Sequence, residues 1–109
     1  MTLNDYQQAA LKTAVYPNIG HNLNYAVLGL VGECGEIANK LKKVHRDDGG
    51  VLTEERRKQL GDELFDALWY VADVAMELGM DLEAVAQRGL AKLAARAEAG
   101  TLHGQGDHR

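Results

Sequence analysis

Two pairs of carboxylates recur with the same spacing of three residues, each surrounded by small or apolar side chains. Glu33 and Glu36 form the first pair, and Glu63 and Asp66 form the second. Residues i and i+3 are neighbours on a helix surface, so each pair projects from one helical face if both stretches are helical. When two such helices pack together, four carboxylates converge and repel one another unless a cation lies between them. The pattern therefore predicts a metal site.

The available donor types favour a hard divalent cation at this site. Di-iron bundles carry a Glu-x-x-His motif on two helices, and this sequence contains none. Zinc sites combine cysteines and histidines at short spacings, and no such spacing occurs here. All four histidines are expected in loops or in the C-terminal tail: His21, His45, His103 and His108. Carboxylates without imidazole favour Mg²⁺, with Mn²⁺ as the alternative, and Mg²⁺ bound in this way indicates phosphate-ester or phosphoanhydride chemistry.

A solvated helix surface is the competing interpretation of either acidic pair alone, because surface helices often carry such pairs. The apolar surroundings of both pairs favour metal binding instead. Cys34, the only cysteine, lies on the apolar stripe of its helix between Glu33 and Glu36. We therefore expect a buried structural thiol rather than a nucleophile.

Four helices are expected to position these acids, since apolar residues recur at helical spacing and no stretch is a convincing strand. Pro17 stops the first helix, Thr53 and Asp81 are suited to cap the third and fourth, and Gly79 is suited to end the third. The expected ranges are 3–15, about 23–44, 53–78 and 81–97. The fold class is therefore all-α, a bundle of four or five helices. Residues 1–100 are expected to form a single helical domain, and residues 101–109 a glycine-rich flexible tail.

The third expected helix combines the most apolar surface with an acidic stripe, and such a conflict tends to mark a functional site. The stripe consists of Glu63, Asp66, Tyr70, Asp73 and Glu77. Tyr70 lies one turn after Asp66, so it is predicted to stack on a base or bind a phosphate. Trp69 lies off this face and is expected in the core or in an interface. Three glycines in the second helix, Gly29, Gly32 and Gly35, predict close approach of a neighbouring backbone or a ligand, since each costs about 1 kcal/mol of helix stability relative to alanine.

Composition and charge exclude several classes of protein. The chain has 109 residues and a net charge of −4, which argues against a nucleic-acid-coating role. With one cysteine it has no internal disulfide, which fits a reducing cytoplasm. The N-terminus lacks the pattern of a signal peptide, and no apolar run approaches the roughly 20 residues of a membrane span. We expect a cytoplasmic protein that binds neither nucleic acid nor membranes.

The two acidic stretches resemble those of a known family. Residues 29–43 read GLVGECGEIANKLKK and residues 61–70 read GDELFDALWY. They resemble the MazG-like nucleoside triphosphate pyrophosphohydrolases of the all-α NTP pyrophosphatase superfamily, whose signature is E-x-x-E, a spacer and E-x-x-D. Here the spacer is residues 37–62, or 26 residues. The resemblance implies Mg²⁺-dependent hydrolysis of an NTP or dNTP to the monophosphate and pyrophosphate, as nucleotide-pool housekeeping. It also implies that Glu33, Glu36, Glu63 and Asp66 hold the metal and carry catalysis.

The resemblance extends to candidate substrate-binding residues. Lys92 and Arg96 match the Lys-Leu-x-x-Arg stretch of the family's last helix, and phosphate contact and a solvated helix face are about equally expected for them. Lys40 is a weaker candidate, for which the solvated face is favoured. Gly89 stands where relatives often have asparagine, which removes a polar side chain near the expected site.

Broad apolar helix surfaces in a short chain predict a homo-oligomer. The family resemblance implies a homodimer or homotetramer with sites near the subunit contacts. Two alternative functions stay open: a non-catalytic metal- or nucleotide-binding helical module, and a phosphoribosyl-ATP pyrophosphatase.

Overall fold

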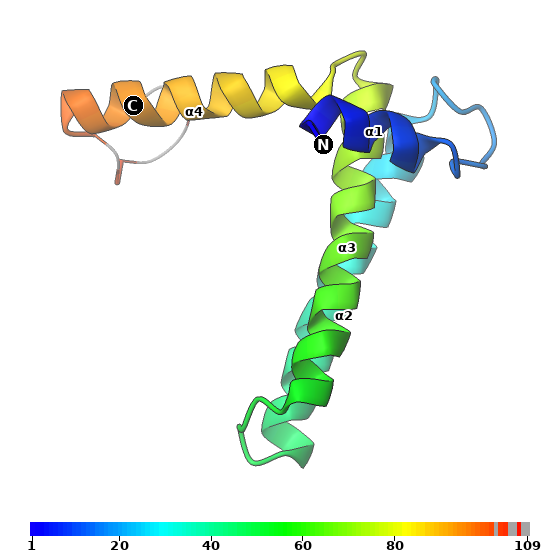
Figure 1. Ribbon diagram of the computed structural model, residues 1–109, viewed down its shortest axis with the longest axis vertical. Helices are drawn as coiled ribbons and strands as arrows, with labels where there is room; N and C mark the ends of the chain where they lie inside the picture. Colours follow the sequence, from blue (N-terminus) through cyan, green and yellow to red (C-terminus); the bar gives the residue numbers. More distant parts are fainter. Residues whose placement is uncertain (102, 105–106, 108–109) are drawn as a thin grey trace.

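The computed structural model describes residues 1–101, 103–104 and 107 of the chain. It contains α1 (Leu3–Leu11), α2 (Leu23–Asp47), α3 (Glu54–Glu77) and α4 (Leu82–Ala99). No strand occurs among the described residues, so the predicted all-α fold is confirmed. α2 and α3 pack side by side as an antiparallel pair, α1 lies across the end of that pair, and α4 leads away from it at a wide angle (Figure 1). None of these helices is long and apolar enough to cross a membrane.

Each helix begins at a side-chain cap. The side-chain oxygen of the capping residue accepts the backbone N–H three residues further on, which satisfies a donor that has no partner within the helix. The predicted caps of α3 and α4 are confirmed, and Gly79, with φ of 71°, follows the end of α3 as predicted. The four caps are Thr2, Asn22, Thr53 and Asp81.

Helix boundaries differ from the predicted ones at three ends. α1 ends at Leu11 instead of residue 15, because the Ala10 carbonyl accepts the Thr13 hydroxyl at 2.8 Å and the Trp69 indole N–H at 2.9 Å. α2 continues to Asp47, so the placement of His45 in a loop was wrong: it lies in the last turn of α2. α4 continues to Ala99 and ends at a left-handed glycine. The predicted tail lies partly outside the described residues, at positions 102, 105–106 and 108–109.

The buried amide of Gln7 ties three helices together. Its Nε2 donates to the Ala72 carbonyl of α3 and to the Met80 carbonyl, both at 3.2 Å, and its Oε1 accepts the Leu82 N–H at 3.0 Å. Tyr6 packs beside it on a small cluster formed by Ala72, Ala75 and Leu82. This junction sets the angle at which α4 leaves α3.

Replacing Gln7 by alanine is expected to destabilise the fold by about 3 kcal/mol, because buried backbone groups lose their hydrogen-bond partners. Gln8 is the matched control, since its side chain is exposed on the same helix. Urea unfolding followed by circular dichroism measures both variants. Equal stabilities of the Gln7→Ala and Gln8→Ala variants would contradict the role of this junction.

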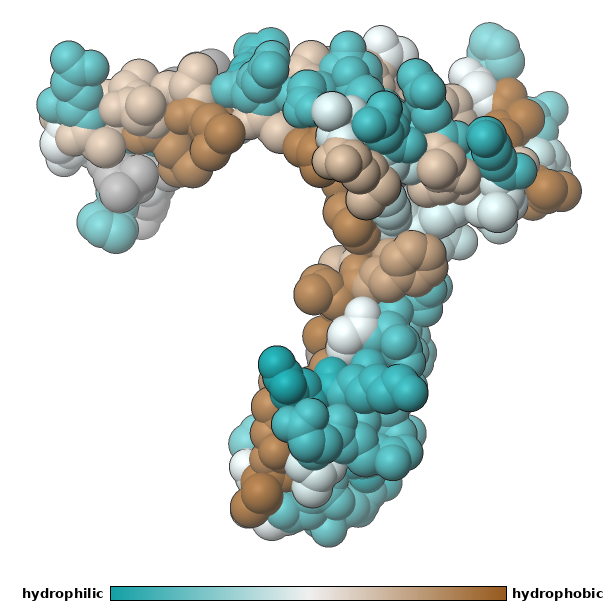
Figure 2. Space-filling view, viewed as in Figure 1, coloured by the Kyte–Doolittle hydropathy of each residue, from teal (hydrophilic) through white to brown (hydrophobic). Residues whose placement is uncertain are grey.

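One chain encloses little apolar volume. The buried apolar residues are mostly alanines: Ala26, Val44, Ala67, Ala72, Ala75 and Leu82. The accessible surface is 7692 Å², whereas a compact chain of this mass exposes about 5,900 Å². The radius of gyration is 16.9 Å, compared with about 13 Å for a compact domain of this length. Figure 2 shows apolar surface gathered on the inner side of the angle between α4 and the α2–α3 pair.

Candidate metal centre

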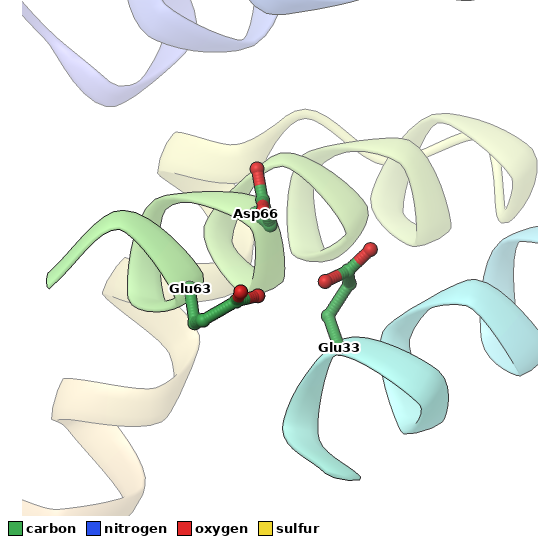
Figure 3. Close-up of side chains that lie close together, drawn as sticks. All are labelled: Glu33, Glu63 and Asp66. Carbon is green, nitrogen blue, oxygen red and sulfur yellow. The ribbon is translucent and has the colours of Figure 1, made fainter. Parts of the chain in front are cut away.

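Pairing of α2 with α3 brings three of the predicted acids together. Glu33 projects from α2 toward Glu63 and Asp66 on α3 (Figure 3). Each residue offers one carboxylate oxygen, and these oxygens all lie within 4.8 Å of one another. All three side chains are half-buried. The antiparallel packing of α2 and α3 therefore brings together oxygen ligands from two acidic pairs that a spacer of 26 residues separates in the sequence.

The cluster carries more negative charge than its surroundings compensate. Burial raises the pKa of Glu33, and the charges of Asp66 and Glu63 raise it further. Lys40 Nζ lies 3.2 Å from Glu63 Oε1 and offsets part of this charge. Lys40, the weaker candidate for substrate contact, for which a solvated helix face was favoured, forms this ion pair at the edge of the cluster.

These residues fit a hard divalent cation. Carboxylate oxygens are the ligands that Mg²⁺ and Mn²⁺ accept, and no nitrogen or sulfur ligand belongs to this group. A bound cation would relieve the repulsion that raises the pKa of Glu33. The donor set and the excess charge both match the metal that the sequence predicts.

Glu36 is the predicted ligand that does not join this group. Its side chain is exposed, one turn after Glu33 on α2. It is close enough for its charge to contribute to the raised pKa of Glu33. The structure thus brings together three of the four predicted acids and leaves the fourth on the solvent side.

An aromatic pocket of about 540 Å³ adjoins the cluster. Glu33 and Asp66 both line it, so the pocket and the acidic cluster form one continuous site. Its size is within the range typical of pockets for small organic ligands. Five aromatic side chains line it: Tyr16, Tyr25, Phe65, Trp69 and Tyr70.

The aromatic walls have a defined arrangement. Tyr16 stacks on Tyr25 with ring centroids 4.2 Å apart and planes inclined by 17°. Trp69 meets Tyr70 edge to face at 4.9 Å, and its indole N–H is fixed by the Ala10 carbonyl. Such flat apolar surfaces, with polar atoms at their edges, suit a planar aromatic ligand.

The structure adds to one sequence-based expectation at this site and contradicts another. Trp69, expected in the core or in an interface, is half-buried and lines the pocket, where its indole N–H donates to the Ala10 carbonyl at the end of α1. Cys34 was expected to be buried, and it is exposed, as is Val31 one turn before it on α2. Tyr16 was not predicted to belong to the site, because its connector carries no periodic pattern.

The close approach predicted for three glycines occurs at one of them. A methyl group at Gly29 would overlap the ring of Tyr70, whereas no atom of the described residues lies within 4 Å of the corresponding positions at Gly32 and Gly35. Gly29 therefore lets Tyr70 lie against α2 beside Glu33. This contact positions the pocket wall that adjoins the acids.

Alanine substitutions at Gly29 and Gly35 are expected to change the stability of the fold in opposite directions. Gly29→Ala forces Tyr70 to move and should destabilise the fold by about 1–3 kcal/mol. Gly35→Ala meets open space and should stabilise it by up to about 1 kcal/mol through helix propensity. Urea unfolding measures both effects, and stabilisation by Gly29→Ala would contradict the packing of Tyr70.

Lys92 and Arg96 lie apart from the cluster in this chain. Both belong to α4, which leads away from the α2–α3 pair that carries the acids (Figure 1). Lys92 Nζ lies 3.2 Å and Arg96 Nη2 lies 3.0 Å from the same carboxylate oxygen, Asp107 Oδ1. The two cations therefore converge on an anion, although the anion is a carboxylate of their own chain.

Comparison with known proteins adds independent information. The sequence model of the MazG nucleotide pyrophosphohydrolase domain matches residues 22–101, which include α2, α3, α4 and all four predicted acids. Gene 37 protein of Mycobacterium phage L5 is 48% identical over 114 aligned positions that cover the whole of both chains. No solved structure matches the chain significantly.

Proposed function

Because the chain belongs to the MazG nucleotide pyrophosphohydrolase family, we propose that it hydrolyses a nucleoside or deoxynucleoside triphosphate to the monophosphate and pyrophosphate. The observation that carries this proposal is the continuity of an acidic cluster with an aromatic pocket. The cluster suits a cation and phosphates, and the pocket suits a base. A role in maintaining the nucleotide pool would put the protein in the cytoplasm.

We propose that Glu33, Glu63 and Asp66 hold Mg²⁺, or Mn²⁺ in its place. A bound cation of this kind neutralises phosphate charge and lowers the pKa of bound water. Glu36 would complete the acidic set, either as a fourth ligand or as the group that orients the attacking water. Water would add to a phosphorus of the triphosphate, the phosphoanhydride bond would break with pyrophosphate and the monophosphate as the two products, and the proton of the water would pass to a carboxylate of this set.

The aromatic pocket supports a site for the base. Tyr16, Tyr25, Trp69 and Tyr70 present ring faces and edges beside Glu33 and Asp66. A base that stacks there would have its phosphates directed toward the acids. Tyr70, which lines the pocket and packs against α2 beside Glu33, is suited to contact either the base or a phosphate.

Self-association is the second part of the proposal. The chain exposes about 1,700 Å² more surface than a compact chain of its mass. If two copies each buried a similar area, the interface would be within the range of obligate dimers. Large apolar side chains on α2, α3 and α4 are exposed and available for it: Leu28, Val31, Leu64, Phe65, Leu90 and Leu93. We propose a homodimer or homotetramer.

Lys92 and Arg96 gain a role in such an assembly. Their own α4 leads away from their own acidic cluster, so they would reach the site of another copy. There they would contact the phosphates, in the manner in which they hold Asp107 in the isolated chain.

Product analysis tests the proposed reaction. The protein is incubated with a panel of NTPs, dNTPs and phosphoribosyl-ATP, with and without Mg²⁺, and pyrophosphate is measured separately from orthophosphate. We expect Mg²⁺-dependent formation of equal amounts of monophosphate and pyrophosphate. Release of orthophosphate would contradict the proposed reaction. Binding of nucleotide without turnover would favour the non-catalytic module.

A further inference from the structure

Asp73 is a buried carboxylate for which the proposed reaction gives no direct role. Its side chain lies on α3 and is 0% exposed. One oxygen, Oδ1, accepts the hydroxyl of Tyr16 at 2.8 Å, and the other, Oδ2, has no hydrogen-bond partner among the described residues. Burial of such a group costs stability. An acid kept in this position despite its cost indicates a functional requirement.

The partner of Asp73 belongs to the pocket. Tyr16 lies in the connector between α1 and α2, residues 12–22, which contains no helix. Its ring forms one wall of the pocket and stacks on Tyr25 at the start of α2. The hydrogen bond to Asp73 is therefore a direct link between the interior of α3 and the pocket wall.

A second acid of α3 holds the far end of the same connector. Glu77 Oε1 accepts the backbone N–H of Asn22 at 2.6 Å, one turn after Asp73 on the helix. Asn22 in turn caps α2 and donates to the Pro17 carbonyl at 2.9 Å. The two acids of α3 thus hold the connector at Tyr16 and at Asn22, and of these two bonds only the one to Asp73 comes from a side chain that lines the pocket.

We propose that Asp73 is a positioning residue for substrate binding. It does not touch the nucleotide. It holds the Tyr16 hydroxyl, keeps the Tyr16 ring stacked on Tyr25, and so sets the affinity of the pocket for the base. The inference rests on the proposed function, in which a base enters this pocket.

The chemistry of Asp73 supplies a conservative variant. Burial raises the pKa of Asp73, and the hydrogen bond from Tyr16 opposes that rise only in part. A neutral acceptor of the same shape therefore suits this position. Asp73→Asn retains an oxygen that can accept the Tyr16 hydroxyl, whereas Asp73→Ala removes the acceptor.

Fluorescence of Trp69 measures nucleotide binding to the pocket in the absence of turnover. Trp69 is the only tryptophan in the sequence and it lines the pocket. The full chain is titrated with nucleoside monophosphates, and steady-state kinetics with the preferred triphosphate follow. We expect Asp73→Ala to weaken monophosphate binding and raise KM by about tenfold while kcat changes by less than about twofold, since a binding interaction alone is lost. Asp73→Asn should remain within about twofold of wild type.

Tyr16→Phe provides the second variant, because it removes only the hydroxyl and keeps the stacking ring. It should weaken binding to a similar extent as Asp73→Ala. The double variant should be no weaker than the poorer single variant, because both changes break the same hydrogen bond. Circular dichroism checks that each variant is folded, and the Tyr16→Phe result decides the matter if Asp73→Ala does not fold.

Several outcomes would overturn the inference. Wild-type affinity in both Asp73→Ala and Tyr16→Phe would show that the bond does not position the wall. A fall in kcat at constant KM, additive effects in the double variant, or an Asp73→Asn defect as large as that of Asp73→Ala would do the same. The proposed function fails separately, if wild-type protein produces no pyrophosphate from any triphosphate or its Trp69 signal does not respond to any nucleotide.

Discussion

Asp66→Asn is expected to reduce Mg²⁺-dependent pyrophosphate release by more than about a hundredfold, since even changes outside the ligand set of a metal cost 10–100-fold. Asparagine has nearly the size of aspartate but lacks its charge. The cluster then retains Glu33 and Glu63, and Glu63 is already paired with Lys40. Too little negative charge remains to hold the cation and its phosphates.

The fold should survive this change. Asp66 contributes to the repulsion that raises the pKa of Glu33, so removal of its charge relieves the metal-free cluster. We expect a midpoint of thermal unfolding at least as high as that of wild type without metal, and no further rise when Mg²⁺ is added. Wild-type protein should gain stability with Mg²⁺, because the cation binds only the folded cluster.

Asp62→Asn is the matched control for Asp66→Asn. Asp62 lies on the same helix and is exposed, and it is not part of the acidic cluster. Asp62→Asn removes the same charge as Asp66→Asn, but from outside the cluster, so the activity and Mg²⁺ response of this variant should remain near those of wild type. Equal activities of the two variants would contradict the assignment of Asp66 to the metal centre.

Leu90→Glu is expected to dissociate the proposed homo-oligomer and to reduce turnover at least tenfold, because an unpaired charge within the proposed apolar interface would be strongly unfavourable. Leu90 is 67% exposed in the isolated chain. It shares one side of α4 with Ala86, Leu93 and Ala97 at helical spacing. It lies far along α4 from its own metal centre, so a loss of activity would act through assembly and the delivery of Lys92 and Arg96 to another copy.

Ala91→Glu is the control for this surface. Ala91 is exposed on the same helix, and its position is 100° around the axis from Leu90, away from the apolar side. Analytical ultracentrifugation measures the mass of each variant at the concentration used for kinetics. A wild-type mass and activity for Leu90→Glu would contradict the proposed interface on α4.

The acidic cluster was largely predictable because its signal is local. Carboxylates three residues apart in apolar stretches define which helix faces carry the acids, and the antiparallel packing of α2 and α3 joins the two faces. The sequence could not separate Glu36 from Glu33, because both match the spacing equally well. Only the packing of the two helices leaves Glu36 exposed.

The pocket was much less predictable because its contacts are distant in sequence. Tyr16 meets Asp73 across 57 positions, and the Trp69 indole meets the Ala10 carbonyl across 59. No periodic pattern relates such residues. The acidic stripe on α3 was recognised as a conflict with its apolar surroundings, but the different contacts of its acids were not predicted. Glu63 and Asp66 belong to the acidic cluster, whereas Asp73 and Glu77 anchor the connector.

The sequence also could not predict that Cys34 and the apolar side of α4 are exposed. Apolar periodicity predicts that a helix face is covered, but it does not say whether the cover comes from the same chain. Cys34 was therefore expected inside a core that a single chain does not form.

Anomalous diffraction from Mn²⁺ tests the metal centre most directly. Crystals of the full chain are soaked with Mn²⁺ and a nucleoside monophosphate, and an anomalous difference map is calculated. We expect the strongest peak between α2 and α3, at bonding distance from the carboxylates of Glu33, Glu63 and Asp66. A strong peak elsewhere with none at these three residues would contradict the assignment of this cluster as the catalytic metal centre.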